Sequence, residues 1–470
     1  MDKPNLLFIF SDQHRLRSLG RYTNEIISPN FDAFADSAAN FTSCISNCPV
    51  CVPIRGSILT GLYSWKHRAI TNDLPIDTTT RSIADVMNEN GYHTGYIGKW
   101  HLGGIPRDKF IPENERLGFT EWKVANCNHT YDQGYYFDED NIRHEFDKFE
   151  SEGQTDLAID FIKRGKENDK PWALTLSWGP PHAPFDAVPQ KYLDLYDPEK
   201  LELPPNVPED GRSILTLDKW IEEDELRQWL QGYYAFITLL DDQFKRLLNS
   251  LEESGQLENT IIVYTSDHGD MLGSQTMNKK QLPYNESIKV PLMVRWAGKT
   301  VSVESDELIS LTDLPVSLMG LMGLEFGTKT DGQDLHRLFI DEKAKGPDYT
   351  LIYELIPCHQ AESRGGREWI GFYDKDYVYA IHSDFSDYII YDNHNDPEQL
   401  NNLANTDPKL SRKLRDKLDG ILNDLNLDFR RWEKFVIEDG LLDTWNMSQR
   451  HFKRVELDPE NIPPFVIHRS

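Results

Sequence analysis

The chain opens with the run Asn5-Leu6-Leu7-Phe8-Ile9-Phe10, which is followed at once by the polar pair Ser11-Asp12. An uninterrupted apolar run that is bounded by polar residues is typical of a strand that is buried on both faces. The stretch therefore predicts that the chain begins with a fully buried strand. The segments around it decide what kind of sheet this strand joins.

Four further short apolar segments have the character of strands, and helical patterns separate them. The strand candidates are Gly95–Ile97, Trp172–Trp178, Thr260–Thr265 and Val290–Trp296. The helix candidates are Arg81–Asn90, Thr155–Arg164, Gln228–Ser254 and Leu311–Leu321. Strands that alternate with helices predict an α/β fold with a largely parallel sheet. In such folds ligands bind outside the carboxyl ends of the strands.

The pattern changes after about residue 345. Three short aromatic segments with polar turns between them predict an antiparallel sheet, and an amphipathic helix follows. We therefore expect two domains, a larger one of residues 1–345 and a smaller C-terminal one of residues 346–470 with an antiparallel sheet and a helix. The segment Lys434–Ser470 supports no structural prediction. The three strand candidates are Trp369–Tyr373, Tyr377–His382 and Tyr388–Tyr391, and the helix candidate is Lys409–Leu425.

The charge and composition exclude several classes of partner. A formal net charge of -27 repels nucleic acids and anionic membranes, so we expect neither as a partner. No run of about 18 apolar residues is present, which argues against a transmembrane helix. The first apolar run is too short for a signal peptide and lacks a basic flank. We expect a cytoplasmic protein, or a periplasmic or secreted one if a signal peptide has been removed. Five cysteines in a chain of this length predict no disulfide framework.

Polar residues follow two of the predicted strands. Asp12-Gln13-His14 comes after the first strand, and Asp267-His268-Gly269-Asp270 comes after Thr260–Thr265. An acidic residue in this place often caps the next helix. Two groups that each pair a carboxylate with a second possible ligand instead indicate a shared metal site.

The segment Cys51–Gly56 (CVPIRG) carries a candidate reactive cysteine. A proline two residues after the cysteine suits the first turn of a helix, which places Cys51 at a helix N-terminus that favours an anion. Arg55 then lies on the same helix face. One alternative is a small buried cysteine with a surface arginine. Another is an iron–sulfur cluster on Cys44, Cys48 and Cys51, whose C-x3-C-x2-C spacing is short and competes for a cysteine that the wider pattern explains better.

Three more segments carry possible catalytic side chains. In Gly98–Gly104 (GKWHLGG), alternation places Lys99 and His101 on one side, where they can hold an oxyanion and transfer a proton. Prolines stiffen the backbone on both sides of His182. Lys280 follows soon after the second acidic group. The alternatives are solvated lysines and a structural histidine.

Taken in order, these segments resemble the signatures of the formylglycine-dependent type I sulfatases of the alkaline phosphatase superfamily. CVPIR at 51–55 with Leu59-Thr60-Gly61 resembles C-x-P-x-R…L-T-G, and 98–103 (GKWHLG) resembles the second signature. KQLPYNES at 280–287 resembles K-x-x-x-Y-E-E-S, and the segment 391–403 resembles the C-terminal signature. The resemblance spans about residues 4–405.

The resemblance implies a fold and a mechanism. The fold is that of alkaline phosphatase, with a large mixed sheet between helices and a smaller C-terminal α+β domain. In the family a separate maturation enzyme oxidises the signature cysteine, here Cys51, to formylglycine. The aldehyde hydrate attacks sulfur, and its second hydroxyl expels sulfate as the aldehyde re-forms. By this resemblance, Arg55 and His101 stabilise and deprotonate the hydrate. Lys99, His182 and Lys280 hold the sulfate oxygens, and His182 or Lys280 protonates the leaving oxygen.

The resemblance also implies a divalent cation, by family usage Ca²⁺, bound by Asp12, Gln13, Asp267 and His268 together with residue 51. Many family members have a second aspartate where Gln13 stands, and asparagine where His268 stands. Calcium prefers oxygen ligands, so His268 is also a candidate for binding the substrate.

The expected reaction is hydrolysis of a sulfate ester on a sulfated small molecule or glycan. An acidic protein suits a short or terminal sugar better than a long polyanion. The rival within the superfamily is a phosphonate monoester hydrolase or phosphodiesterase, against which Lys99 and His101 argue. A non-catalytic relative that only binds sulfated ligands is a third possibility, against which the intact set of charged residues argues. The oligomeric state is left open. The candidate specificity residues are His14, Asn72, His129, Tyr131, Arg364 and Arg367.

Overall fold

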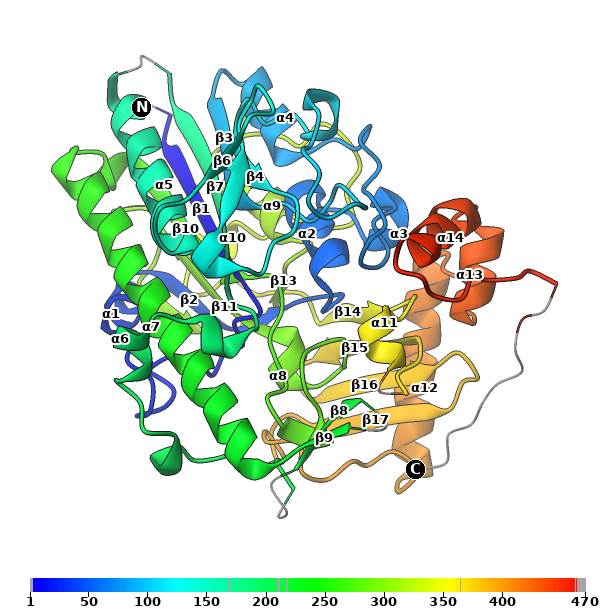
Figure 1. Cartoon of the computed structure of the whole chain (residues 1–470). Coiled ribbons are helices and arrows are strands. Elements are labelled where there is room, and N and C mark those ends of the chain that lie inside the picture. Colours follow the sequence, from blue (N-terminus) through cyan, green and yellow to red (C-terminus); the bar gives the residue numbers. More distant parts are fainter. Residues whose placement is uncertain are drawn as a thin grey trace.

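The computed structural model describes residues 3–167, 170–208, 212–216, 219–363, 365–460 and 462. Within them, the main feature is an 11-stranded sheet in the order β12-β2-β11-β10-β1-β7-β3-β4-β5-β6, with β13 paired to β2 (Figure 1). The strands are β1 (Asn5–Asp12), β2 (Ala39–Ile45), β3 (His93–Lys99), β4 (Glu121–Ala125), β5 (Tyr135–Phe137), β6 (Arg143–Glu145), β7 (Trp172–Pro181), β10 (Thr260–Ser266), β11 (Lys289–Arg295), β12 (Val303–Ser305) and β13 (Ile309–Ser310).

All five predicted strands of this sheet are present, but the sheet is mixed. The central strands β10, β1, β7, β3 and β4 are parallel to their neighbours in this row. The strand β11 runs antiparallel to both β10 and β2, and β5 is antiparallel to β4 and β6. The expectation of a largely parallel sheet therefore holds only for the centre. A strand has the same apolar pattern in either direction, so the sequence pattern did not reveal the reversal.

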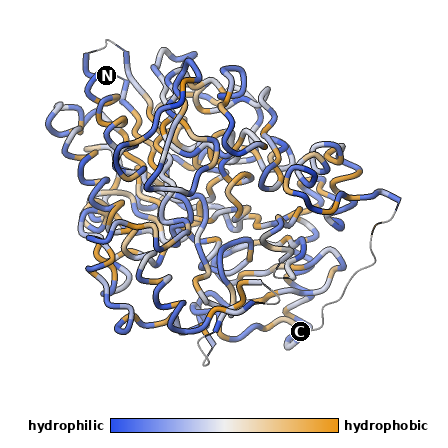
Figure 2. The backbone as a smooth tube through the Cα atoms, in the orientation of Figure 1, coloured by the Kyte–Doolittle hydropathy of each residue, from blue (hydrophilic) through white to orange (hydrophobic). Residues whose placement is uncertain are grey.

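Helices cover both faces of the large sheet, and β1 explains why its run is apolar throughout. Leu6, Phe8 and Phe10 enter one core, which they share with helices α2, α4 and α9. Leu7 and Ile9 point to the opposite core, which is formed with α1, α5 and α7. Figure 2 shows the hydrophobic segments collected in the interior between these layers. The helices are α1 (Pro29–Asp36), α2 (Cys51–Thr60), α4 (Ile83–Glu89), α5 (Glu150–Glu167), α7 (Glu223–Glu253) and α9 (Leu314–Leu321).

The C-terminal part contains a four-stranded antiparallel sheet in the order β14-β15-β16-β17. The three predicted strands and the predicted helix are confirmed, and β14 adds a strand that was not predicted. A third core joins this sheet and α12 to Cys48 and Val50, which directly precede α2. The division at residue 345 stays a prediction. The elements are β14 (Tyr349–Glu354), β15 (Trp369–Asp374), β16 (Tyr377–His382), β17 (Asp387–Asp392), α12 (Pro408–Leu425), α13 (Trp432–Glu438) and α14 (Leu442–His451).

The remaining helices and strands are short. None of the helices in the described residues has the length and apolar character needed to span a membrane. The strands β8 and β9 pair only with each other. These short elements are α3 (Ser64–His67), α6 (Gln190–Leu193), α8 (Asn285–Ile288), α10 (Arg337–Ile340), α11 (His359–Glu362), β8 (Ser213–Thr216) and β9 (Lys219–Ile221).

A close approach of two strands positions the first candidate catalytic lysine. Gly98 has φ 107°, and a Cβ atom at this position would lie 2.0 Å from the carbonyl oxygen of Ser177 on β7. Only glycine accepts both the positive φ and the contact. Lys99, the next residue, ends β3. The carboxyl ends of β1, β3, β7 and β10 thus meet at one edge of the sheet, where the parallel pairing predicts a ligand site.

Candidate active site

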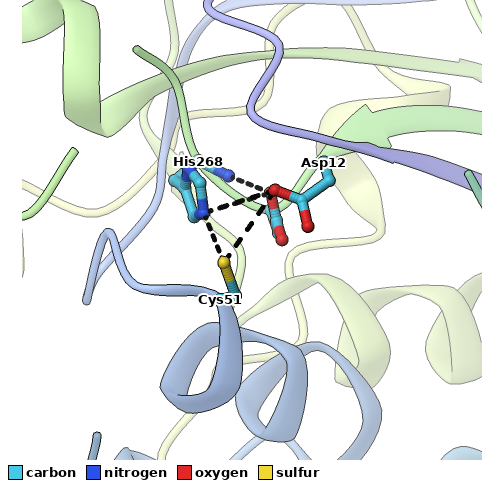
Figure 3. A group of neighbouring side chains, drawn as sticks. Asp12, Cys51 and His268 are labelled. Carbon is cyan, nitrogen blue, oxygen red and sulfur yellow. Dashed lines mark hydrogen bonds and ion pairs between the residues drawn. The ribbon is translucent and has the colours of Figure 1, made fainter. Parts of the chain in front are cut away.

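Four buried side chains from β1, α2 and the loop that follows β10 converge at this edge. One ligand atom from each of Asp12, Cys51, Asp267 and His268 lies within 4.8 Å of all the others. The Sγ atom of Cys51 is 3.2 Å from Nε2 of His268, which is 3.7 Å from Oδ1 of Asp12. Figure 3 shows Cys51 at the start of its helix, with Asp12 and His268 turned toward it. The two polar groups that follow β1 and β10 therefore form one cluster, as the sequence predicts.

Cys51 is the first residue of α2, and its helix begins as the sequence predicts. Val50 is the N-cap in extended conformation, and Pro53 lies in the first turn. The side-chain oxygen of Asn72 accepts a hydrogen bond from the backbone N–H of Val52 at 3.2 Å. Asn72, one of the specificity candidates, therefore lies directly beside the N-terminus that carries Cys51.

Arg55 is fully buried and connects the two carboxylates. Its Nε is 3.0 Å from Oδ2 of Asp267, and its Nη2 is 3.1 Å from Oδ2 of Asp12. The Nη1 group donates to Ser177 Oγ at 2.7 Å. These bonds use Oδ2 of each aspartate. Oδ1 of each aspartate is left facing Nε2 of His268. The alternative of a surface arginine is wrong, and Arg55 orients both carboxylates.

Two buried lysines reach the cluster, one through Asp12 and the other through Gln13. Lys99 Nζ is 2.5 Å from Oδ2 of Asp12, and Lys280 Nζ donates to Oε1 of Gln13 at 2.5 Å. Burial and Asp12 raise the pKa of the Cys51 thiol, but Lys280, His268 and Lys99 outweigh them and hold this pKa below its usual value. The lysines are 2% and 1% exposed, so the alternative of solvated lysines is wrong.

His101 is buried beside the cluster with no hydrogen-bond partner for its ring. Among the described residues, neither Nδ1 nor Nε2 has a partner, although both atoms are inaccessible to solvent. Burial, together with the charges of Lys99 and Arg107, holds the pKa of His101 well below its usual value. Buried polar groups in native proteins usually have a hydrogen-bond partner. The nitrogens of this neutral ring are therefore available to bind a ligand group or to accept a proton from it.

His182 follows the end of β7, where its ring stacks on a second histidine. The rings of His129 and His182 are 4.2 Å apart between centroids and are inclined by 16°. Nδ1 of His182 lies 2.7 Å from the carbonyl oxygen of Ala183, an acceptor, so Nδ1 carries the hydrogen and Nε2 is left for other contacts. The Tyr131 hydroxyl donates to the carbonyl oxygen of His182 at 2.7 Å. His129 and Tyr131 are thus next to a predicted site residue.

Gln13 lies at the border of the cluster. Its backbone N–H donates to Oδ1 of Asp267 at 3.0 Å, and its side-chain amide nitrogen donates to Asp270. Its amide oxygen accepts from Lys280. The structure therefore places Gln13 against one of the clustered carboxylates, with its only side-chain oxygen engaged by a lysine.

Two specificity candidates are placed elsewhere. His14 is buried in the core, where its ring nitrogens contact the Tyr264 hydroxyl at 2.8 Å and the carbonyl oxygen of Ser18 at 2.7 Å. Burial lowers the pKa of His14 to about 4. Both ring nitrogens are used within the protein, which leaves neither of them for a substrate. Arg367 pairs with Asp384 at the turn between β16 and β17. Arg364 lies outside the described residues.

The structure bears on the alternative of an iron–sulfur cluster, and it adds one site residue, Ser177, that the sequence did not predict. Within the described residues, the only clustered group of His, Cys, Asp and Glu with metal-binding spacing contains Cys51 without Cys44 or Cys48. Cys44 packs in the first core and Cys48 in the third, whereas Cys51 joins Asp12, Asp267 and His268, and this distribution argues against an iron–sulfur cluster on the three cysteines. Ser177, which holds Arg55, was missed. Its position near the end of the predicted strand Trp172–Trp178 is the signal that could have found it.

Comparisons with known proteins identify the family. The sulfatase family model matches residues 4–324, and a model described as N-sulphoglucosamine sulphohydrolase, C-terminal, matches residues 273–426. An ulvan-active sulfatase of Formosa agariphila is 34% identical over 431 residues, which cover 90% of this chain and 80% of the relative. An endo-4-O-sulfatase of Bacteroides thetaiotaomicron is 27% identical over 86% of this chain and 88% of its own length.

A solved structure agrees with the sequence relatives. A putative sulfatase from Bacteroides fragilis superimposes with a TM-score of 0.83 at 28% identity, over 91% of this chain and 97% of that protein. The alkaline-phosphatase-like architecture predicted from the motifs is thereby confirmed, with its large mixed sheet and its smaller antiparallel C-terminal sheet. The chain belongs to the sulfatase family, the type I sulfatases of the alkaline phosphatase superfamily, and is a sulfuric ester hydrolase.

Proposed function

We propose that this sulfatase removes sulfate from a sulfated carbohydrate and that formylglycine, made from Cys51 by a separate maturation enzyme, is its nucleophile. The observation that carries the proposal is the position of Sγ of Cys51, at a helix N-terminus and 3.2 Å from His268, with Lys99 and Lys280 close enough to lower the pKa of its thiol. The relatives support a sulfated glycan as substrate, because they include an ulvan-active sulfatase and an endo-4-O-sulfatase.

The chain's own residues supply the rest of the chemistry. Formylglycine supplies, as its hydrate, one hydroxyl that attacks sulfur and a second whose deprotonation releases sulfate. His101 accepts a proton, because its ring is neutral and unpartnered within the described residues. Lys99 and Lys280 hold sulfate oxygens and balance the charge that develops on them.

The leaving oxygen of the substrate needs a proton as its bond to sulfur breaks. We assign this proton to Nε2 of His182, which carries it only in the doubly protonated ring because Nδ1–H is held by the carbonyl oxygen of Ala183. Burial and the charge of Lys280 hold the pKa of His182 well below its usual value, and the negative charge of a bound sulfate ester opposes this shift and favours the protonated ring. Lys280 is the second candidate, although its Nζ is directed to Gln13 in this structure. Asn72 and His129 lie beside these groups and are proposed to contact the sugar.

The cluster of Asp12, Asp267 and His268 fits a divalent cation, with Gln13 and residue 51 completing the set. Two carboxylate oxygens and a ring nitrogen within 4.8 Å of one another form a suitable donor set. We propose Ca²⁺ by family usage, and a metal that accepts nitrogen as the alternative because of His268. Such a cation balances charge on sulfate oxygens.

The metal assignment predicts that Asp267→Asn loses its bound divalent ion. Removing the charge removes one of two carboxylates from the donor set, so we expect metal content to fall by tenfold or more at equal free metal, on the order expected for altered metal ligands. Elemental analysis after dialysis measures this. The control is Asp241→Asn, a buried carboxylate that instead caps α1 through Phe31 N–H at 2.7 Å. Full metal in a folded Asp267→Asn protein contradicts the assignment.

The proposed substrate class predicts the order of rates on a panel of esters. We expect kcat/KM to be highest for a sulfated mono- or oligosaccharide and lower for the matching phosphate and for a phosphonate monoester. Steady-state kinetics of the matured enzyme on this panel tests the function. If a phosphonate ester is cleaved faster than every sulfate ester, the sulfatase proposal is wrong and the chain is better described as a phosphonate monoester hydrolase.

A further inference from the structure

Glu150 is a buried carboxyl group that the proposed chemistry does not use. It is the first residue of α5 and is 2% exposed. Its Oε1 accepts a hydrogen bond from Gln154 Nε2 at 2.9 Å, and its Oε2 accepts one from Asn128 Nδ2 at 3.0 Å. No cation of the described chain forms a salt bridge with it. Burial raises the pKa of Glu150 to about 7, against the opposing hydrogen bonds and the charge of Lys99.

Two glycines make room for this carboxyl group at the end of β7. A Cβ atom on Gly134 would lie 2.8 Å from Cβ of Glu150, and one on Gly179 would lie 3.3 Å from its Oε1. Gly179 is three residues before His182 on the same segment. Glu150 is therefore packed against the backbone segment that leads to His182, the proposed proton donor.

Glu150 also anchors the loop 127–131. Asn128 uses its side-chain oxygen for the N–H of Thr130 at 3.1 Å and for the Thr130 hydroxyl at 2.6 Å. This turn directs the Asn128 amide nitrogen at Glu150, 3.0 Å away. Both partners of Glu150 donate through amide groups, so the carboxylate is the form that accepts from each with a separate oxygen.

The loop 127–131 holds His182 in two ways. The ring of His129 covers one face of the His182 ring at 4.2 Å. The hydroxyl of Tyr131 donates to the carbonyl oxygens of His182, at 2.7 Å, and Gly179, at 3.2 Å. Ring and backbone are thus fixed by the same five residues. A displacement of this loop changes where Nε2 of His182 points.

We propose that Glu150 is a positioning residue for proton transfer to the leaving group. Through Asn128 it fixes the loop 127–131, and this loop fixes the ring of His182. The inference rests on the proposed role of His182 as the proton donor. General acid catalysis depends on hydrogen-bond geometry between the donor and the leaving oxygen, so a misaligned ring slows substrates that need the proton.

The test compares substrates that differ in their need for the proton. Glu150→Gln keeps the shape but offers one acceptor oxygen to two amide donors, so one hydrogen bond is lost. We expect kcat to fall on the order of tenfold to a hundredfold for an alkyl or sugar sulfate, whose alcohol is a poor leaving group. For an aryl sulfate with an acidic phenol, we expect a change of no more than about threefold, because this leaving group departs without a proton. KM is expected to stay the same for both.

Two further variants keep the test decisive. Asn128→Ala breaks the same contact from the half-buried side of the loop and is expected to show the same dependence on leaving group. Glu368→Gln alters another buried carboxyl, which accepts from Ser383 in the C-terminal sheet, and is expected to leave both rates unchanged. If a folded Glu150→Gln or Asn128→Ala enzyme slows both substrates equally, or neither, the positioning role is wrong. If the wild type cleaves no sulfate ester, the proposed function itself fails.

Discussion

The Cys51→Ala enzyme is expected to lose sulfate ester hydrolysis by about ten-thousandfold or more in kcat, since removal of a covalent nucleophile leaves only binding and electrostatic contributions. Cys51 is 1% exposed at the start of α2, with Sγ directed at His268 and Asp12. Alanine fits this space and keeps the helix, so the loss is expected in kcat with little change in unfolding temperature. Kinetics and thermal denaturation together measure this.

The same site makes a prediction about the covalent state of the active enzyme. Protein made with the maturation enzyme is expected to carry formylglycine at residue 51, in which oxygen replaces sulfur and two hydrogens are lost. Mass spectrometry of the peptide containing residue 51 detects this change, and Cys44→Ala is the matched control because Cys44 is a buried cysteine in the core. Fully active protein that contains only the thiol at residue 51 contradicts the nucleophile assignment.

The central strands and the cluster were predictable because both depend on local patterns. The run Leu6–Phe10 is apolar at every position because β1 contributes to two cores, and a buried strand of this kind is visible in sequence. The polar residues after β1 and β10 come together because these strands are parallel neighbours, with Ser11 opposite Ser266. Parallel pairing of two predicted strands thus brings Asp12 and Asp267 to the same edge without any further information.

Other features depend on tertiary contacts that a linear pattern does not contain. The strands β5 and β6 have three residues each, which is too short for a recognisable apolar pattern. In addition, β6 begins and ends with charged residues, Arg143 and Glu145, so its sequence resembles that of a loop. His14 has the sequence position of a site residue, yet its ring turns into the core toward Tyr264. Glu150 has no motif around it, and its link to His182 passes through the loop 127–131. These contacts exist only after the chain has folded.

Lys99→Ala and His101→Ala are each expected to lower kcat/KM for sulfate esters by on the order of a hundredfold or more, the usual cost of removing one group that stabilises a charged transition state. A sulfate monoester carries one negative charge, and splitting its S–O bond moves charge onto the leaving oxygen. Fixed cations and a proton acceptor at the site therefore act mainly in the transition state, so the loss should fall on kcat. Lys99 ends a strand and is paired with Asp12 in the interior, so unfolding temperature is measured in parallel.

Matched controls and a choice of substrates make the comparison specific. His93→Ala alters the opposite end of the same strand, where the half-buried ring pairs with Glu121, and Lys123→Ala alters a lysine of the neighbouring strand that pairs with Glu139. Both pairs lie near the surface and are expected to leave kcat/KM within about twofold of the wild type. The panel consists of matched aryl sulfate, phosphate and phosphonate esters together with sulfated sugars, because the proposed substrate is a sulfated carbohydrate. Lys99 and His101 belong to the segment 98–103, which resembles the second sulfatase signature, so we expect their loss to reduce the preference for sulfate over phosphonate as well as the rate. Folded variants that keep near-normal sulfate rates would show that residues 98–104 do not hold the sulfate, and the proposed contacts to the sulfate would then be reduced to His182 and Lys280.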